Sequence, residues 1–533
     1  MFKIWNLYRN EMFKLAKKPS TWILTIIIPA LVIFVTVISL LVSVANNYAN
    51  MPTVENDWKA SLNEEINMLK GQYYDSEGKL IEGGEVSPES QLIIDKYLYQ
   101  IEKNIKPETW KAYVLDKITQ KKISIVSDTL GLLTDAQKEA LNKEIENLWK
   151  TVEQDNWKEY LNIENEQTKN SQLLSEGEKN VILTINKLRI DYDIEPKGSM
   201  NFNPFSSAYY YGNDADRDKN SWKHDKLRSV ESNMTAQVQY EKLGYYQVPS
   251  EGMMYSSGEI SYDETLLKKN IAIDIESIKT NNPPLEDKSF IKFFGDGTQY
   301  MFLILIFVII VAGTVVSQEF TRGTVKFLVV TPNKRWKIFT AKIMAVVSFT
   351  VFFTLTLMVS VFITSAVSSG MNDISKSKIF FDGSKTYEVS LFLLCIRNYG
   401  IELVSVLAYA IMAVMLATLS RSTALSVAFG IGLYFVSSIV VSLSLMVMSG
   451  LSMMYGTVQA YAGFFRYILF YNTNALSYAE PLYQNDMVVS MTGGMVPKFS
   501  DMSAGFSLCV LAAYIVVMLM ISYDSFNRRD IKN

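Results

Sequence analysis

The sequence is poor in the residues that build disulfide, metal and nucleotide sites. Its 533 residues include two cysteines, Cys395 and Cys509, and one histidine, His224. These numbers exclude a disulfide-stabilised scaffold and a His-rich metal site. The phosphate-binding pattern G-x-x-x-x-G-K-[ST] does not occur, so any ATP that is used must be bound by another polypeptide. The net charge of −3 excludes the strongly basic surface of a nucleic-acid-binding protein.

Charge is missing from six long stretches of the chain. About 20 apolar residues cross the ~30 Å hydrocarbon core of a membrane as a helix. A signal peptide is the alternative for the first stretch, but its apolar core would be only ~7–15 residues long. We therefore predict six transmembrane helices. They are Trp22–Val44, Thr298–Ser317, Ile343–Val367, Ile401–Leu419, Ala424–Met448 and Phe506–Tyr523.

The remaining charges are distributed unevenly. Residues 47–297 contain 43 acidic and 30 basic residues, a net charge of −13, whereas the rest of the chain carries +10. Lys and Arg are concentrated in the short connections on the side of both termini, which predicts that both termini are cytoplasmic. The segment 47–297 is then an extracellular domain, and it contains no cysteine.

The expected extracellular domain is mostly helical, with an α+β character. Thr134 can cap a helix that continues through AQKEALNKEIENLWKTV, with apolar residues at helical spacing. A second helical stretch is predicted near Ile101–Val126. Residues 201–262 are rich in Tyr, Asn, Gly and Ser, which favours loops and short strands.

Neither the spans nor this domain contains a recognisable catalytic set. Asp214, Asp216 and Asp218 alternate as at the start of a calcium loop, but the required Gly and Glu are absent, which favours a solvated acidic turn. We expect His224 at the surface and both cysteines to be packing residues. Arg397 and Glu402, near the fourth span, are expected at the outer interface. The aromatic stretch Ser449–Asp501 is expected to form outer-leaflet helices.

Two segments are expected at the cytoplasmic surface. Residues 1–20 predict an amphipathic connector helix, for which a plain basic flank is the alternative. The second segment, at about 318–329, predicts a short amphipathic helix that ends before Pro332, for which a basic connector is the alternative. The apolar face of the first helix comprises Phe2, Trp5, Met12, Leu15 and Ala16.

The residues around this second segment carry a family resemblance. The pattern Glu319…Gly323-Thr324…Leu328…Pro332…Arg335…Lys342 resembles the loop after the second span in permease subunits of ABC-2 type (type V) ABC transporters. The segment Asn10-Glu11…Lys14…Pro19-Ser20…Trp22 resembles the connector helix of that family, and Ser420-Arg421-Ser422 is similar to its turn between the fourth and fifth spans. The resemblance covers chiefly the membrane part, that is, residues 21–46 and 298–533 with the connector helix.

The resemblance implies a permease subunit in the cell membrane, and the Lys-, Asn- and Ile-rich composition with few cysteines is typical of a bacterium with a low-GC genome. Two copies of a separate ABC ATPase would bind ATP and Mg, while this chain would bind no cofactor and would itself not be an enzyme. A second permease copy, identical or related, would complete the transporter. Residues 318–329 would be the coupling helix that docks on the ATPase. The implied coupling residues are Gln318, Glu319, Arg322, Gly323, Thr324, Phe327, Leu328, Pro332 and Arg335.

The resemblance also implies export of an amphipathic or hydrophobic substrate, such as a peptide or an antibiotic. The second and fifth spans would line its path, although their small residues are equally suited to helix packing. The alternatives are a membrane-anchored receptor or sensor without transport, and an outer-surface enzyme. The path residues would be Gly313, Thr314, Ser317, Gly430, Gly432, Tyr434, Ser437 and Ser438.

Overall fold

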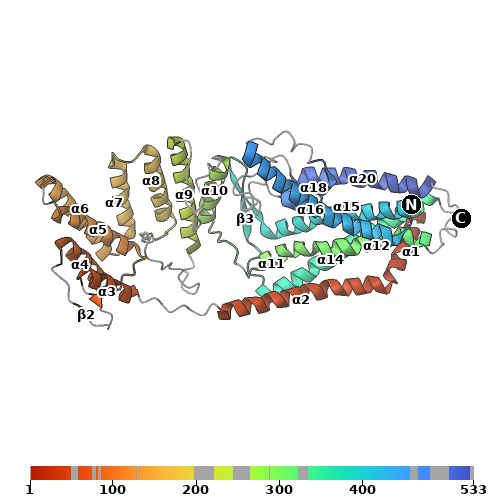
Figure 1. Cartoon of the computed structure of the whole chain (residues 1–533), viewed down its shortest axis with the longest axis horizontal. Helices are drawn as coiled ribbons and strands as arrows, with labels where there is room; N and C mark the ends of the chain where they lie inside the picture. Colours follow the sequence, from red (N-terminus) through yellow and green to blue (C-terminus); the bar gives the residue numbers. More distant parts are fainter. Residues whose placement is uncertain are drawn as a thin grey trace. The chain divides into compact units, whose positions relative to one another are not determined.

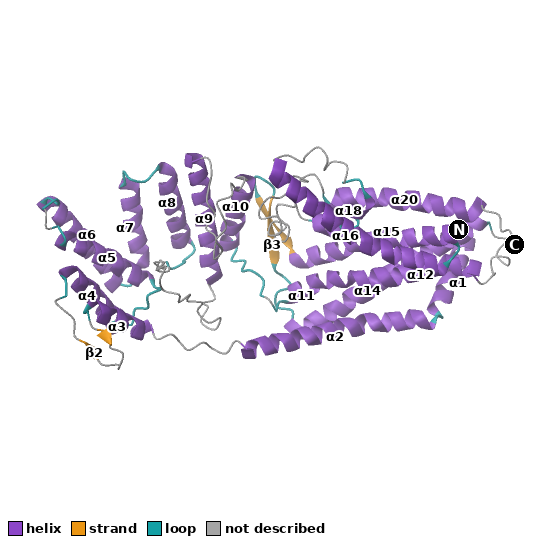
Figure 2. Cartoon of the chain, viewed as in Figure 1, coloured by secondary structure: helices purple, strands orange, loops and turns teal. Residues whose placement is uncertain are grey.

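A computed structural model gives the fold of most of the chain. The described residues are 2–49, 58–71, 73–74, 80–81, 86–128, 131–196, 221–243, 264–286, 288–321, 334–455, 466–479 and 503–528. They are predominantly helical (Figures 1 and 2) and fall into two compact units. The membrane unit comprises Met1–Asn46, Pro284–Phe380 and Tyr387–Asn533, and the insert unit comprises Asn47–Pro283 and Phe381–Thr386.

Six segments among the described residues are long and apolar enough to cross a membrane. The predicted fold class, an α-helical polytopic membrane protein with six spans, is confirmed. The segments are Thr21–Ile38, Phe290–Glu319, Arg335–Ser369, Leu391–Ser420, Thr423–Val441 and Ala504–Asn527. Their main helices are α2 (Pro19–Ala49), α12 (Met301–Thr321), α14 (Arg335–Ser369), α15 (Leu391–Ser420), α16 (Thr423–Tyr455) and α20 (Ala504–Arg528).

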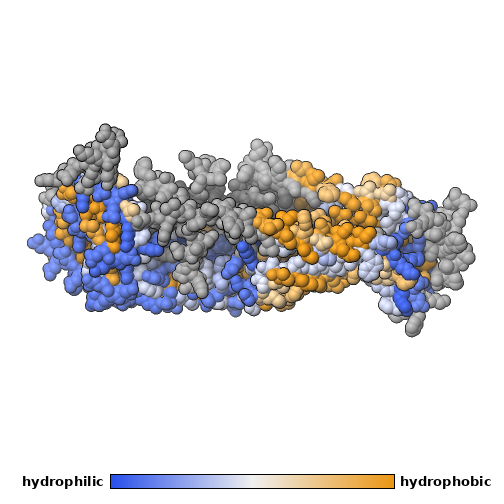
Figure 3. Space-filling view, turned by 90° about the horizontal axis from the view of Figure 1, so that it is seen from below, coloured by the Kyte–Doolittle hydropathy of each residue, from blue (hydrophilic) through white to orange (hydrophobic). Residues whose placement is uncertain are grey.

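Helices α12 and α15 lie at the centre of the membrane unit. Helix α12 packs against α14, α15 and α16, and α15 also packs against α20. By contrast, α2 leaves apolar side chains such as Ile26 and Leu41 65% and 63% exposed. The exposed surface of the spans is mostly hydrophobic, whereas that of the insert unit is mostly hydrophilic with smaller hydrophobic patches (Figure 3). Such an apolar surface is suited to contact with lipid.

Shorter elements complete the membrane unit. The fourth span begins at Leu391, earlier than predicted, because it directly follows a two-stranded sheet. Arg397 therefore lies on helix α15, where it is exposed and donates to Asn398, and Glu402 lies half-buried on the same helix. The shorter elements are α1 (Phe2–Ala16), α11 (Phe290–Asp296), η2 (Gly297–Tyr300), β3 (Ser377–Phe381), β4 (Thr386–Ser390), α18 (Leu469–Asn472) and η3 (Ala475–Tyr478).

The insert unit is a succession of helices with well-formed starts. Thr134 accepts a hydrogen bond from the Gln137 amide and the Gln137 side chain accepts one in return, so the predicted helix from Thr134 is confirmed as α6. The helical stretch predicted near Ile101–Val126 corresponds to α5, which begins later, at Trp110, because Thr109 caps it, while Ile101 and Glu102 end α4. The elements are α3 (Trp58–Leu69), β1 (Tyr73–Tyr74), β2 (Leu80–Ile81), α4 (Pro88–Glu102), α5 (Trp110–Val126), α6 (Asp135–Glu153), α7 (Trp157–Asn170), α8 (Glu176–Asp191), α9 (Ser221–Leu243) and α10 (Glu264–Lys279).

In the series from α3 to α10, the extensive contacts are between helices that follow one another in the sequence, as Figure 1 shows for α7 to α10. The first core lies between α5, α6 and α7 around Trp110 and Leu161. The second core lies between α8, α9 and α10 around Leu227 and Ile278. Among the described residues, the insert unit is thus a row of helices with two successive cores, similar in principle to helical repeat proteins.

Helix α9 corrects one sequence expectation. Residues 201–262 were expected to form loops and short strands, which is wrong for Ser221–Leu243. Leu227 and Val230 are fully buried, and Met234 and Val238 follow at helical spacing. Polar residues lie between these apolar positions, so the apolar face is not evident from the sequence. The rest of 201–262, including Asp214, Asp216 and Asp218, lies outside the described residues.

Candidate coupling site

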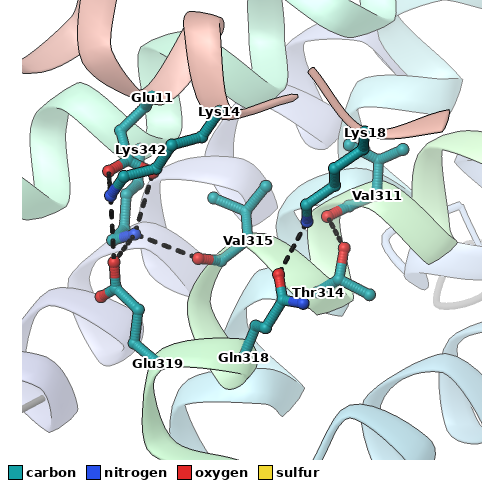
Figure 4. A network of polar contacts seen from close by, with 9 residues as sticks. All are labelled: Glu11, Lys14, Lys18, Val311, Thr314, Val315, Gln318, Glu319 and Lys342. Atoms are coloured by element: carbon teal, nitrogen blue, oxygen red, sulfur yellow. Dashed lines mark hydrogen bonds and ion pairs between the residues drawn. The ribbon is translucent and has the colours of Figure 1, made fainter. Parts of the chain in front are cut away.

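Four charged side chains meet where α12 ends and α14 begins (Figure 4). The Lys342 Nζ atom donates to Glu319 Oε1 at 2.7 Å and to Glu11 Oε2 at 3.1 Å. Lys14 Nζ donates to Glu11 Oε1 at 2.7 Å and lies 3.9 Å from Glu319 Oε1. We call Glu11, Lys14, Glu319 and Lys342 the ion cluster. It joins α1, α12 and α14 through side chains that are far apart in the sequence.

Lys342 is the centre of the ion cluster. Its side chain is 0% exposed, and an ammonium group removed from water is costly unless it is paired. Its Nζ atom makes a third hydrogen bond to the Val315 carbonyl oxygen at 3.1 Å, so all three ammonium protons have acceptors. Two carboxylates and two ammonium groups make the cluster neutral, which suits its position at the ends of apolar helices.

The charges of the cluster change the titration of its members on α1. Burial alone raises the pKa of the Glu11 carboxyl, but Lys342 and Lys14 outweigh burial and hold that pKa below its ordinary value. Burial likewise lowers the pKa of Lys14, but its hydrogen bond to Glu11 and the charges of Glu11 and Glu319 raise it above its ordinary value. Both groups therefore stay charged over a wider pH range than free side chains.

These shifts predict a pH-dependent stability. Because the folded-state pKa of Glu11 is depressed, its contribution is present above the ordinary value of 4.5 and is lost as the pH falls through the folded-state pKa. We expect the thermal unfolding midpoint of the wild type to fall more steeply on acidification than that of Glu11→Gln. Unfolding scans of the purified protein between about pH 3 and 7 measure this difference.

The control for this experiment is Glu146→Gln, which changes an exposed residue of α6. Its pH profile should follow that of the wild type. Parallel profiles for the wild type and Glu11→Gln would contradict the role of Glu11 in the cluster.

Other polar contacts hold α1 in place beside the ion cluster. Lys18 Nζ donates to Gln318 Oε1 at 2.7 Å (Figure 4), and the Tyr8 hydroxyl lies 2.9 Å from Ser348 Oγ of α14. Thr21 Oγ1 donates to the Leu15 carbonyl oxygen at 2.8 Å across the turn between α1 and α2. Helix α1 and the turn that follows it are therefore linked to α12 and α14 at several points.

The structure describes three of the expected coupling residues. Gln318 and Glu319 join the contacts around the cluster, whereas Arg335 Nη1 donates to the Asn527 carbonyl oxygen of α20 at 3.2 Å. Glu319 thus lies in the ion cluster and Gln318 lies beside it, whereas Arg335 contacts α20. The expected coupling residues outside the described ranges are Arg322, Gly323, Thr324, Phe327, Leu328 and Pro332.

Sequence reasoning did not include four members of this network among the site residues: Glu11, Lys14, Lys18 and Lys342. A usable signal was the position of Lys342, which immediately precedes a long apolar run. A charge at such a boundary needs a partner if it is drawn into the membrane part. Glu319 occupies the matching position at the end of the preceding apolar run.

The sequence matches the family profile described as ABC-2 family transporter protein over residues 5–531. The chain belongs to this family. Two proteins of Bacillus subtilis (strain 168) are similar to it. The uncharacterized protein YhcI is 25% identical over 280 residues, which are 52% of this chain and 80% of YhcI. The uncharacterized membrane protein YdbK is 23% identical over 247 residues, which are 46% of this chain and 85% of YdbK.

As an ABC-2 family member, the chain is a multi-pass transporter membrane subunit. Two of its expected path glycines lie at the contact between α12 and α16. A Cβ atom on Gly313 would lie 2.8 Å from Ser426 Oγ, and one on Gly430 would lie 2.8 Å from Ile309 Cγ2. Both glycines therefore allow these two helices to approach closely. Gly432 has open space around it instead.

Three of the expected path hydroxyls of this ABC-2 subunit take part in hydrogen bonds within the membrane unit. Thr314 donates to the Val311 carbonyl oxygen, and Ser317 donates to that of Gly313. Ser437 Oγ lies 2.8 Å from the Tyr409 hydroxyl, whose ring also contacts Tyr434 edge-on. The side chain of Ser438 lies outside the described residues.

Across the described residues of this subunit, no three His, Cys, Asp or Glu side chains are grouped as metal ligands. Cys395 is buried against α11, where its Sγ atom lies 3.9 Å from the Ile291 carbonyl oxygen, and Cys509 is exposed on α20. His224 lies on α9 of the insert unit.

Proposed function

We propose that this ABC-2 family member is the permease subunit of an ATP-driven exporter. It moves an amphipathic or hydrophobic substrate, such as a peptide or an antibiotic, out of a bacterial cell. A separate ABC ATPase, present in two copies, hydrolyses ATP with Mg, and a second permease copy completes the path. Both termini are cytoplasmic and residues 47–297 are outside, an orientation supported by the Lys and Arg of the terminal side.

The ion cluster is the observation that carries this proposal. The segment 318–329 begins at the end of α12, and α14 begins at Arg335. Lys342 Nζ of α14 donates to Glu319 Oε1 of α12 at 2.7 Å. This hydrogen bond holds together the two helices that flank the segment between α12 and α14. Lys342 extends the link to Glu11 of α1. A movement of this segment by an ATPase is therefore transmitted to α1, α12 and α14 together.

The test is a measurement of coupling in the assembled transporter. The permease is purified with the ABC ATPase that it captures in its host cells, and the complex is reconstituted into vesicles. The double variant Glu319→Ala with Gly323→Leu removes one carboxylate of the cluster and adds bulk to the expected coupling helix. We expect substrate-stimulated ATP hydrolysis to fall by about tenfold, within the usual range of coupling free energies.

The control for the coupling test is Glu146→Ala in the insert unit, which should leave stimulation unchanged. Thermal unfolding of both variants separates loss of coupling from loss of folding. Wild-type stimulation in the double variant would refute the assignment of the coupling segment. A permease that binds no ATPase would favour the receptor alternative.

A further inference from the structure

A groove lies within the insert unit, between α9, α10 and the turn that joins β3 to β4. Its volume is about 620 Å³, which is large enough for a small amphiphilic molecule. The turn residues Phe381–Thr386 belong to the same compact unit as α9 and α10. All the described lining residues therefore belong to one compact unit.

The floor of the groove is apolar. It is lined by Met234 of α9, Ile271 and Ile275 of α10, and Phe381 at the end of β3. Ile271 and Ile275 are four residues apart, so they lie on the same face of α10. All four side chains are half-buried, which means that their apolar surface is only partly covered by the protein. A ligand that covers this surface would gain hydrophobic stabilisation.

The rim of the groove is basic. Lys268 and Lys279 of α10 and Lys385 of the turn all line it, and all three are exposed. Glu276 is the one acidic residue among the described lining residues, and it lies 3.6 Å from Lys279. The lining therefore carries a net charge of +2, whereas residues 47–297, which supply all of the lining except the turn residues, carry −13.

We propose that the groove binds a single-chain anionic amphiphile. A phosphate or carboxylate head would lie among Lys268, Lys279 and Lys385, while the apolar tail would cover the floor. Lysine ammonium groups are suited to such heads, and Gln237 and Ser384 provide neutral hydrogen-bonding groups beside them. A cationic amphiphile would meet the same apolar floor but would be repelled by the rim. This proposal does not depend on the transport function.

The experiment uses the full chain in phosphatidylcholine nanodiscs, which carry no net headgroup charge. The probe is dodecyl phosphate with a photoreactive diazirine in its chain. A dodecyl glucoside and a dodecyl trimethylammonium probe with the same diazirine are the matched controls. After illumination, mass spectrometry of peptides locates the labels. We expect the phosphate probe to label α9, α10 and the turn at least threefold more than either control.

Two lysine variants provide the second arm. Lys268→Gln with Lys385→Gln is expected to reduce phosphate-probe labelling of the groove by about fivefold, because two surface charges are removed. Lys242→Gln is the matched control, since this exposed lysine lies on α9 but does not line the groove. Exposed substitutions should leave thermal unfolding unchanged, so lost labelling reports lost binding.

Equal labelling by the phosphate and glucoside probes would overturn the proposal, because it would reveal an apolar patch without charge selection. Labelling that is insensitive to the double lysine variant would also overturn it. A further variant, Phe381→Ser, should reduce labelling by the phosphate probe through loss of the floor. Unchanged labelling in Phe381→Ser would exclude the assigned position of the tail.

Discussion

Replacing Lys342 with methionine is expected to lower the stability of the membrane unit by about 3–5 kcal/mol, because it leaves buried carboxylates without their partner. Glu11 and Glu319 would lose the ammonium group that lies 3.1 Å and 2.7 Å from them. The thermal unfolding midpoint of the protein in detergent should fall clearly, and ATPase coupling should be lost in the complex. Methionine has a similar length, so loss of packing is a minor part of the effect.

A rescue experiment separates charge from packing at this position. In the Lys342→Met background, Glu11→Gln and Glu319→Gln should recover part of the lost stability, because they remove the uncompensated carboxylates. Lys337→Met is the matched control on the same helix, where its ammonium group lies over the Trp336 ring. If Lys342→Met and Lys337→Met unfolded at the same temperature, the ion cluster would have no structural role.

Substitution of Gly297 by alanine is expected to cost about 2–3 kcal/mol by overpacking. A Cβ atom at this position would lie 2.2 Å from the Tyr399 hydroxyl oxygen and 2.5 Å from Val361 Cγ1. The Tyr399 hydroxyl cannot move without cost, because it donates to the Phe294 carbonyl oxygen at 3.0 Å. The unfolding midpoint should therefore fall, although alanine is normally favoured over glycine in a helical segment.

Two further variants define the cause of the Gly297 effect. Adding Tyr399→Phe to Gly297→Ala removes the closest overlapping atom and should restore part of the midpoint. Gly400→Ala is the control, since open space surrounds that position. It should be neutral or slightly stabilising. A midpoint for Gly297→Ala equal to that of Gly400→Ala would show that the neighbouring helices relax freely.

The spans could be predicted from the sequence because crossing the bilayer depends on the length and apolar composition of each segment by itself. About 20 uncharged apolar residues are sufficient, whatever their partners are. The helix from Thr134 could be predicted for a similar reason, since Thr134 and Gln137 lie within one turn. By contrast, Ser221–Leu243 was missed because its apolar face becomes visible only when α8 and α10 cover it.

The candidate site could be predicted only in part, because its partners are distant in the sequence. Lys342 and Glu11 are separated by 331 positions, and no local pattern reports their contact. Glu319 was identified through the resemblance of its loop, whereas Glu11 was placed only in a connector helix. The same limit applies to the glycines. The sequence shows that Gly313 and Gly430 are small residues, but only the fold shows which neighbours they contact.

The row of helices in the insert unit has a consequence for how the length of this protein can vary in evolution. Because α3 to α10 each pack mainly on their sequence neighbours, a helix pair can be gained or lost without rebuilding a central core. YhcI and YdbK, which are matched over 80% and 85% of their lengths by about half of this chain, are shorter proteins than this one.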